Sequence, residues 1–289
     1  MMRSMFAAIS GLKQHQTMLD VTANDIANVN TLGFKANRVT FKDSLSQLQR
    51  GGAAQTAGQG GQNPAQVGLG VALSSIDSVM GGGALQSTGN VLDVAIQGEG
   101  WFRVGQGTAP AVPAALEYTR AGNFSRNDQG YLVTQDGYFV VGKQAVAAAG
   151  PPVTYSPGAA DGLINIPTGA TNVAIAQDGS VSYVPTGGGP RVTAGYLSLA
   201  KFANEPGLQR AAGNRWLASP ASGTENVGTP GTTAAGTWGV TTSGTIEMSN
   251  VDLATEFTNM ITAQRGFQAN SRVIGAADEM LTELVNMKR

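Results

Sequence analysis

The chain has 289 residues, of which 42% are hydrophobic and only 13% charged, and its formal net charge at pH 7 is −1. This near-neutral balance gives no electrostatic reason to expect nucleic acid or an acidic membrane surface as a partner. The absence of cysteine excludes disulfides and thiol chemistry, and a single histidine, His15, argues against a zinc site. We expect His15 to be a solvated or interface side chain.

The N-terminal segment lacks the continuous apolar run and the small-residue cleavage site of a secretory signal, because Ser10, Lys13 and His15 interrupt it. Nor does the chain contain the run of about 18 apolar residues that a membrane-spanning helix requires. These features alone predict a cytosolic protein without membrane insertion.

The first predicted element is a helix from about residue 4 to about residue 29, roughly 40 Å long. Its apolar residues follow alternating gaps of three and four, the spacing that keeps one stripe of a helix against a partner helix. Gly33 follows the helix and suits the left-handed residue that closes a helix. The stripe contains Met5, Ile9, Leu12, Leu19 and Ile26.

After the helix, the stretch ANDIANVNTLGFK (Ala23–Lys35) introduces asparagines, which weaken a helix because their side chains compete for backbone hydrogen bonds. Residues 31–75 are then rich in glycine, glutamine and alanine, with too few large apolar residues to pack a core. We predict an extended linker, or a loop ordered by contacts, in which Phe34, Phe41 and Leu45 are among the few apolar anchors.

A β-rich pattern follows over about residues 76–245. Val91–Val104 is typical of a hairpin around GEG, and Tyr118–Gly142 has the spacing of a three-stranded meander. Ala145–Gly162 is rich in alanine, proline and glycine and predicts a surface excursion. Further strands are expected at 163–167, 172–176, 180–184, 195–202 and 215–219.

The last element is a second helix, predicted over about residues 251–288, with Ser249 or Asn250 as its cap. Its helix-spaced apolar stripe contains Leu253, Phe257, Met260, Phe267, Ile274 and Leu281. The predicted fold is therefore α+β: a central all-β domain, with N- and C-terminal helices (residues 1–30 and 246–289) paired as a discontinuous coiled-coil domain. Either the two helices form a hairpin within one chain, or they complete their folding against other chains. We favour the second, because an isolated pair leaves much apolar surface in water.

The sequence contains only weak matches to catalytic motifs. Gly137–Gln144 approaches a phosphate-binding loop, but Gln144 occupies the position of the magnesium-binding Ser or Thr, and no helix follows Lys143. Acidic residues such as Glu117 and Asp136 fall at turns or strand ends, which favours a solvated face over an acid–base pair. We therefore predict no enzyme, and no catalytic, cofactor-binding or metal-binding residues.

These segments together resemble the flagellar axial proteins of the rod and hook family, and most closely its hook proteins. The similarity runs through ANDIANVNTLGFK, VTFKDSL, NPAQVGLG, QSTGNVLDVAIQGEGWF, YTRAGNFSRNDQGYLV, KFANEPGLQRAAGNRW and SGTIEMSNVDLATEFTNMITAQRGFQANSRVIGAADEML. Asp25 departs from the usual ANNIANVNT. The family signature residues are Asn24, Asn28, Asn30, Gly33 and Phe34.

The resemblance implies a helical homopolymer, in which paired terminal helices form a tube around a central channel with the β domain outside. It also implies export by the flagellar type III apparatus without a cleaved signal, hence an extracellular place in the hook or basal body. Phe41 and Leu45 match the family's export pattern of Phe, three residues and a hydrophobic residue, although both residues could simply pack the linker.

Three functions remain open. The main expectation is a small hook subunit that transmits motor torque for motility and meets the hook cap, rod and hook–filament junction proteins. The second is a distal rod subunit. The third, of another class, is a secreted β-rich enzyme or carbohydrate-binding module with helical dimerisation arms; against it, Trp101, Trp216 and Trp238 are scattered where core packing explains them.

Overall fold

The computed structural model describes residues 2–55, 58, 60–147, 155–231 and 238–287. The chain forms two compact units. We call the first the helical unit; it contains Met1–Asn28, Ala36–Val79 and Val251–Arg289. The second, the β unit, contains Val29–Lys35 and Met80–Asn250. The predicted α+β class, with terminal helices flanking a central β-rich region, is confirmed.

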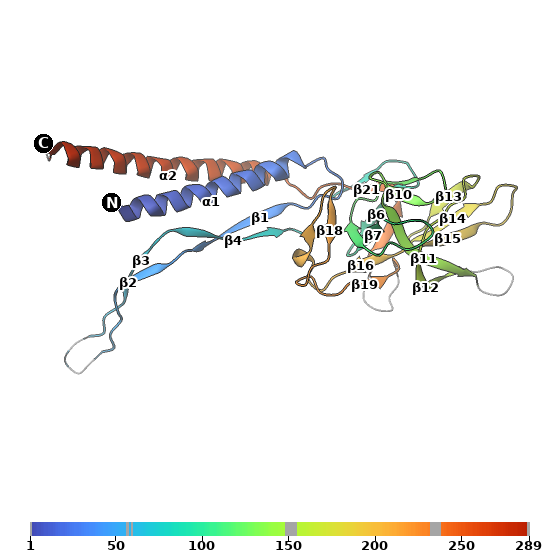
Figure 1. Ribbon diagram of the computed structural model, residues 1–289, viewed down its shortest axis with the longest axis horizontal. Helices are drawn as coiled ribbons and strands as arrows, with labels where there is room; N and C mark the ends of the chain where they lie inside the picture. Colours follow the sequence, from blue (N-terminus) through green and yellow to red (C-terminus); the bar gives the residue numbers. More distant parts are fainter. Residues whose placement is uncertain (1, 56–57, 59, 148–154, 232–237, 288–289) are drawn as a thin grey trace. The chain divides into compact units, whose positions relative to one another are not determined.

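In the helical unit, α1 (Met2–Ala27) and α2 (Leu253–Met287) lie side by side and antiparallel (Figure 1). Both helices end within a few residues of the predicted bounds, because no proline interrupts either apolar pattern. Within the described residues, neither helix is long and apolar enough to cross a membrane.

Residues 36–79 differ from the predicted linker. They contain β1 (Asn37–Asp43), β2 (Ser46–Arg50), β3 (Ala65–Gly68) and β4 (Val71–Ser78), which pair as β1–β4 and β2–β3. Helix α1 packs against both β1 and β4. The β2–β3 pair, which we call the arm, has almost entirely exposed side chains. Its strands are held mainly by backbone hydrogen bonds, so they lack the apolar alternation that would have revealed them.

The β unit is built around one large antiparallel sheet, whose longest run of neighbours is β13-β14-β15-β11-β7-β8-β18-β17. A short 3₁₀ helix, Glu205–Gly207, precedes β17. The strands of the unit are β5 (Leu85–Ser87), β6 (Val94–Gln97), β7 (Trp101–Gly105), β8 (Leu116–Thr119), β9 (Phe124–Arg126), β10 (Leu132–Thr134), β11 (Phe139–Ala147), β12 (Tyr155–Leu163), β13 (Thr171–Ile175), β14 (Ser180–Val184), β15 (Val192–Leu197), β16 (Leu199–Lys201), β17 (Gln209–Arg210), β18 (Arg215–Leu217), β19 (Asn226–Gly228), β20 (Val240–Ser243) and β21 (Thr245–Glu247).

The predicted meander is confirmed, because β9, β10 and β11 pair in sequence order. The predicted hairpin at Val91–Val104 is wrong. Strand β6 pairs with β20, whereas β7 pairs with β8, β11 and β16. Gly98 and Gly100 between them both have positive φ, at 114° and 132°. The chain therefore turns away from hairpin pairing, and β6 is buried by strands distant in sequence.

Of the further predicted strands, 172–176, 180–184, 195–202 and 215–219 correspond to β13, β14, β15 with β16, and β18. The stretch 163–167 is not a separate strand, since Leu163 ends β12 and Asn165 forms only an isolated bridge with Tyr131. The predicted excursion is partly strand: β11 and β12 pair out to Ala147 and Tyr155. Its middle, 148–154, lies outside the described residues.

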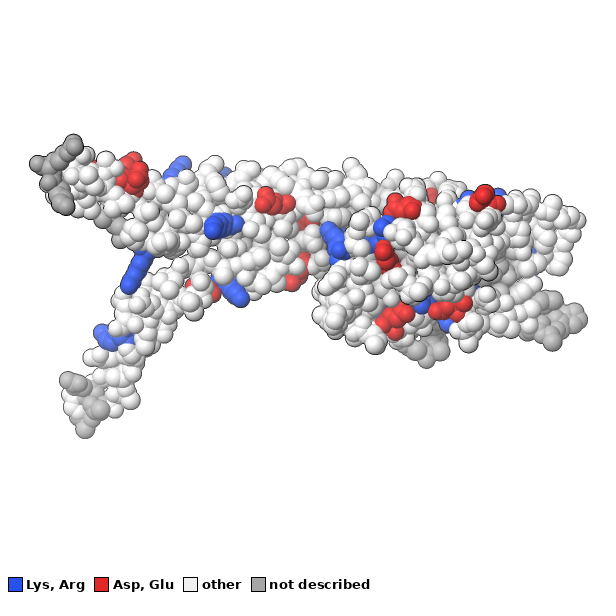
Figure 2. Space-filling model, in the orientation of Figure 1, with Lys and Arg blue, Asp and Glu red and all other residues white. Residues whose placement is uncertain are grey.

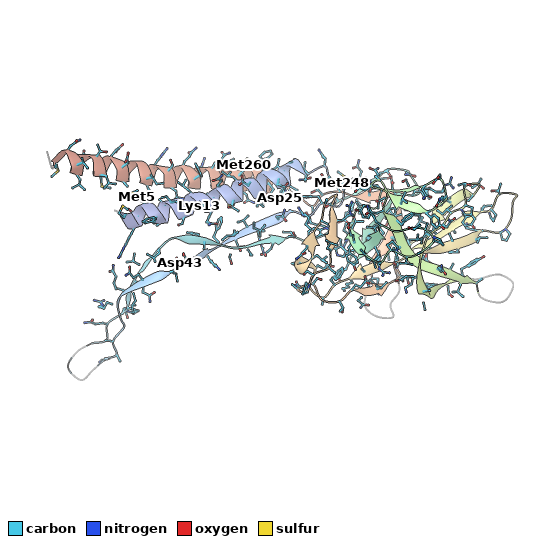
Figure 3. All side chains as sticks on the ribbon, in the orientation of Figure 1. Met5, Lys13, Asp25, Asp43, Met248 and Met260 are labelled. Atoms are coloured by element: carbon cyan, nitrogen blue, oxygen red, sulfur yellow. The ribbon has the colours of Figure 1, made fainter. Side chains whose placement is uncertain are left out.

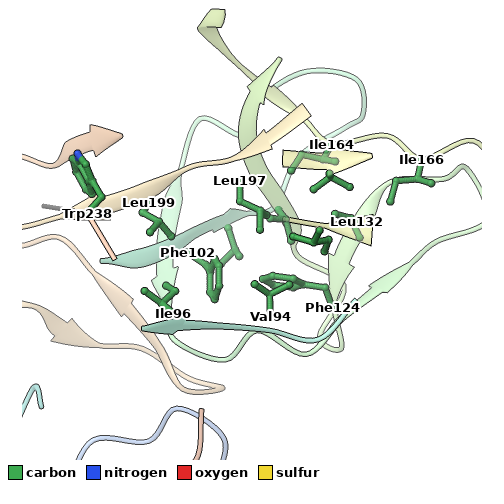
Figure 4. Close-up of a cluster of buried hydrophobic side chains, with 14 residues drawn as sticks. Val94, Ile96, Phe102, Phe124, Leu132, Ile164, Ile166, Leu197, Leu199 and Trp238 are labelled. Carbon is green, nitrogen blue, oxygen red and sulfur yellow. The ribbon is translucent and has the colours of Figure 1, made fainter. Parts of the chain in front are cut away.

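Figure 4 shows the main core of the β unit, where side chains from several strands meet. Phe102 and Phe124 pack edge to face, with ring centroids 5.1 Å apart. A second cluster gathers around Trp101 and Trp216, whose centroids are 5.6 Å apart. Fully burying one such large apolar side chain contributes about 1.5–3 kcal/mol. The main core contains Val94, Ile96, Phe102, Val104, Phe124, Leu132, Val140, Ile164, Ile166, Ile175, Val181, Leu197, Leu199 and Trp238.

Candidate assembly site

The residues of α2 that are fully buried in the helical unit are small, although large apolar residues beside them are half-buried. Ala263 and Ala277 are the fully buried side chains of α2, and Ala8 and Gly11 are buried on α1. Small residues let two helix backbones approach closely without large interdigitating side chains. The pair is thus closed through a narrow seam, and most large apolar residues of α2 are not needed to form it.

Two reciprocal contacts fix the register of this seam. A Cβ placed on Gly11 would lie 2.7 Å from Nδ2 of Asn270, and one placed on Gly266 would lie 2.5 Å from Cε1 of His15. Each glycine thus lies against a polar side chain of the opposite helix. That side chain comes four residues after the glycine of its own helix. His15 also meets Phe41 of β1, with ring centroids 6.0 Å apart and the planes at 71°. The histidine is therefore an interface side chain of the helical unit.

The residues predicted for the apolar stripes separate into two groups. Half-buried are Met5, Leu12, Leu19, Ile26, Met260, Ile274 and Leu281. Exposed are Ile9, Leu253, Phe257 and Phe267. Only part of the apolar stripe predicted from the periodicity is therefore buried within the helical unit.

Val285, which continues the predicted stripe of α2, is exposed as well, and further exposed apolar residues lie outside the stripe: Phe6, Ile261, Val273, Met280 and Leu284. For Ile261 a signal was present, because Leu253, Phe257 and Ile261 are spaced by four and so form a second ridge on α2. Figure 3 shows side chains of α2 projecting on the side away from α1. An exposed apolar surface of this extent is typical of a protein–protein contact.

The first half of the ANDIANVNTLGFK segment belongs to the helical unit. Nδ2 of Asn28 donates to the backbone oxygen of Asn24 at 2.9 Å, within the turn that ends α1. The buried Asp25 accepts hydrogen bonds from the backbone N–H of Asn37 at 2.7 Å and from Nδ2 of Asn37 at 3.0 Å. Asp25, the departure from the usual motif, therefore ties the end of α1 to the start of β1.

At the start of α2 the predicted caps are replaced by Asp252. Its carboxylate accepts hydrogen bonds from Oγ1 of Thr255 at 2.7 Å and from the N–H of Ala254 at 3.0 Å, and these bonds lower the pKa of Asp252. One turn later, burial raises the pKa of Glu256, and the nearby charges of Asp25 and Asp252 raise it further against the hydrogen bond from Asn259. A carboxylate rather than a hydroxyl or amide thus occupies the positive end of this helix.

The second half of the segment belongs to the β unit. Gly33 is left-handed, with φ 63°, but it lies six residues beyond the end of α1 and does not close the helix. A Cβ on Gly33 would lie 2.9 Å from the backbone N of Ala121, which leaves no room for a side chain. Phe34 is buried beneath the guanidinium of Arg210, 4.5 Å from the ring centroid. Asn30, in contrast, is exposed.

Lys35, which ends the segment, is fully buried together with Glu247. Its Nζ donates to Oε1 of Glu247 at 2.6 Å and to the backbone oxygen of Gly81 at 2.8 Å. Arg120, 3% exposed, donates from its NH1 to Oε2 of Glu247 at 3.3 Å. Burial lowers the pKa of Lys35, and the attraction of Glu247 opposes this. We call these three residues the Glu247 cluster; composition and periodicity gave no signal for it.

The two candidate export residues lie where β1 ends and the arm begins. Phe41 is 36% exposed and contacts His15, and Leu45 is 69% exposed between β1 and β2. Packing within the helical unit therefore covers most of the Phe41 side chain, whereas most of the Leu45 side chain is exposed to water.

Features of an enzyme or a carbohydrate-binding module are scarce. Trp101, Trp216 and Trp238 are all buried, so none of them offers a ring to a sugar. Among the described residues, no three His, Cys, Asp or Glu side chains gather in a way that could hold a metal ion. A 540 Å³ pocket in the β unit has mainly apolar walls, with one charged residue, Arg126. On the face shown in Figure 2, charged side chains of both signs are dispersed over a mostly uncharged surface.

Three parts of the chain match known protein families. Residues 5–35 match a family described as flagella basal body rod protein. Residues 95–183 match the flagellar hook protein FlgE/F/G D1 domain, and residues 242–287 match the flagellar basal body rod FlgEFG protein C-terminal region. The matches cover both helices and much of the β unit.

Full-length relatives are also similar to the chain. It is 46% identical over 293 residues to the flagellar basal-body rod protein FlgG of Bacillus subtilis (strain 168), with 100% of both chains covered. It is 31% identical over 291 residues to the flagellar basal-body rod protein FlgG of Borreliella burgdorferi, again with 100% of both covered. The flagellar hook protein FlgE of the same organism is 26% identical over 450 residues, with 100% of both covered.

Proposed function

The chain belongs to the flagellar rod and hook protein family, and we propose that within this family it is a subunit of the distal rod. It is a structural subunit of the flagellum and not an enzyme. The observation that carries the finer assignment is the end-to-end match to relatives named as rod proteins.

The sequence patterns had favoured the hook, but chain length favours the rod. The alignment to the Borreliella burgdorferi rod protein runs over 291 positions, close to the 289 residues of this chain. The alignment to the hook protein of that organism runs over 450 positions, so a large part of the hook protein has no counterpart here. Strands β11 and β12 pair out to Ala147 and Tyr155, so the sequence between them, residues 148–154, is too short to contain a further domain.

The helical unit supplies the proposed assembly surface. Its intramolecular seam uses Gly11, Ala263 and Gly266, so the exposed apolar residues of α2 are left for helices of neighbouring copies. In a tube of such copies, every subunit would gain the burial that the single chain lacks, at about 25 cal/mol per Å² of apolar surface. The polymerisation, the coiled-coil packing of the helices and export by the flagellar type III apparatus belong to this proposal.

The proposal also changes the expected neighbours. A distal rod subunit would contact its own copies, other rod proteins and the base of the hook. The hook cap and the hook–filament junction proteins would be neighbours only under the hook alternative.

Isolated hook–basal bodies test the assignment. An epitope inserted directly after β2, between the exposed Gly51 and Gly52, would be located by electron microscopy with gold-labelled antibody. We expect the label within the rod, on the inner side of the outer ring. Label along the curved segment beyond that ring would instead support the hook subunit. An absence of label from both would contradict the axial role itself.

A further inference from the structure

Glu247 connects three stretches of the β unit that are far apart in sequence. Its Oε1 accepts from the Nζ of Lys35 at 2.6 Å and from the backbone N–H of Gly83 at 2.9 Å. Its Oε2 accepts from Arg120 at 3.3 Å, and its backbone oxygen accepts from the N–H of Gly33 at 2.8 Å. Glu247, the last residue of β21, thus accepts hydrogen bonds from both side chains and backbone groups.

Further hydrogen bonds join three stretches of the β unit, 29–35, 80–84 and 247–250. The N–H of Met248 donates to the oxygen of Ala84 at 2.9 Å, and the N–H of Asn250 donates to the oxygen of Phe34 at 3.3 Å. Nδ2 of Asn250 also donates to the oxygen of Gly81 at 3.1 Å. All four covalent crossings between the units begin in these stretches, because the helical unit resumes after Lys35 and Asn250 and ends before Val29 and Met80. Glu247 therefore lies in one of these stretches and is hydrogen-bonded to the other two, through Gly33 and Lys35 and through Gly83.

The charges of the Glu247 cluster are not balanced. Two cations, Lys35 and Arg120, surround one carboxylate, and all three side chains are at most 3% exposed. Removing the carboxylate would leave two buried cations without it, and a buried charge that loses its partner is strongly destabilising. Removing Lys35 would instead leave Arg120 and Glu247 as a balanced pair. The two partners of the short ion pair are therefore not equivalent.

We propose that Glu247 is the positioning residue of the β unit, whose carboxylate fixes the three stretches through which the chain connects to the helical unit. Lys35 and Glu247 are 212 residues apart in the chain. The end of the ANDIANVNTLGFK segment, at Lys35, therefore reaches its final position only once the C-terminal stretch 247–250 is in place. The inference concerns the β unit alone and applies equally to a rod or a hook subunit.

Amide hydrogen exchange in the full-length chain tests the proposal. In Glu247→Gln, which keeps the shape of the side chain, we expect the amides of Gly33 and Gly83 to exchange about a hundredfold faster, while the core amide of Val104 is unchanged. Lys35→Met should have a smaller effect than Glu247→Gln. In Lys35→Met/Glu247→Gln, exchange at Gly33 should slow again relative to Glu247→Gln, because one uncompensated buried cation is gone.

Glu99→Gln is the matched control, since Glu99 pairs with Lys201 but is 62% exposed. We expect no change at Gly33 in this variant. Equal acceleration at Val104 in Glu247→Gln would show a general loss of stability and overturn the positioning role. If Glu247→Gln does not fold, the double variant decides alone: a folded double variant supports the charge argument, and one that also fails to fold contradicts it.

Discussion

In the β unit, Trp101, Phe102 and Leu199 expose none of their surface, whereas on α2 Phe257 and Leu284 each expose 49%. The two regions thus use the same class of residue in opposite ways. The β unit buries its large side chains against strands from many parts of the chain, as in a self-sufficient core. The fully buried apolar side chains of the two helices are alanines, and most of the large apolar side chains of α2 stay exposed or only half-buried. The large apolar side chains of α2 that stay exposed in the single chain are available for burial against further copies.

The largest expected contrast comes from placing one carboxylate in each region. Phe102→Asp would bury an unpaired charge in the core, so we expect the β unit to lose its cooperative unfolding transition. Phe267→Asp falls on an exposed position of α2, so melting of the β unit should shift by no more than about a degree or two, since surface substitutions change little. Tube formation and motility should nevertheless be abolished. Calorimetry and electron microscopy measure both effects; a large loss of β-unit stability in Phe267→Asp would place α2 in the core of the single chain.

The exposed apolar residues near the arm allow a test of export. If Phe41 and Leu45 are read by the export apparatus, Phe41→Ala/Leu45→Ala should remain in the cytoplasm at normal abundance. Leu48→Ala/Val67→Ala removes two other exposed apolar side chains of the arm and should leave export unchanged. Quantitative blotting of cell and culture fractions compares the two double variants, and normal secretion of the first would leave only a packing role for Phe41 and Leu45.

A smaller effect is expected from two glycines of α2. Gly266→Ala would force the His15 ring to move, so we expect the helical unit to lose about 1–3 kcal/mol, as for overpacking. Gly275 has open space around it, so Gly275→Ala should stabilise the helix by about 0.5–1 kcal/mol. Urea unfolding followed by circular dichroism at 222 nm measures both. Adding His15→Ala to Gly266→Ala should recover stability; without recovery, the reciprocal contact does not set the register.

The smallest effect concerns pH. Burial and the charge of Asp25 raise the pKa of Glu256, so the folded helical unit binds this proton more tightly than the unfolded chain does. The resulting stabilisation is fully present below the unfolded-state pKa and is lost as pH rises through the raised value. Glu256→Gln should therefore stabilise the unit at pH 7 by less than about 1 kcal/mol, because water screens a half-buried carboxylate, and its advantage should shrink toward pH 5. Unfolding measured between pH 5 and 7 would show a constant difference if Glu256 were unperturbed.

The sequence by itself determined the elements whose signals are local. Both helices follow from an uninterrupted apolar period, and the β9–β10–β11 meander follows from short β-rich runs separated by turn residues. The residue type permits the left-handed conformation of Gly33, but it determines neither that conformation nor the place of Gly33 in the fold. The resemblance to flagellar axial proteins needed only contiguous motifs, while the preference for hook over rod rested on finer differences that full-length relatives reversed.

Only the tertiary structure decided which residues meet. Periodicity identifies an apolar stripe but not the face a partner covers, so the seam through Gly11 and Gly266 was invisible in the pattern. The β1–β4 pairing was missed because backbone hydrogen bonds carry no side-chain signature, and the pairing of β6 with β20 joins segments far apart in sequence. The burial of Lys35 depends on a carboxylate 212 residues away. Such contacts form only when distant segments are brought together, and a local pattern contains no information about that distance.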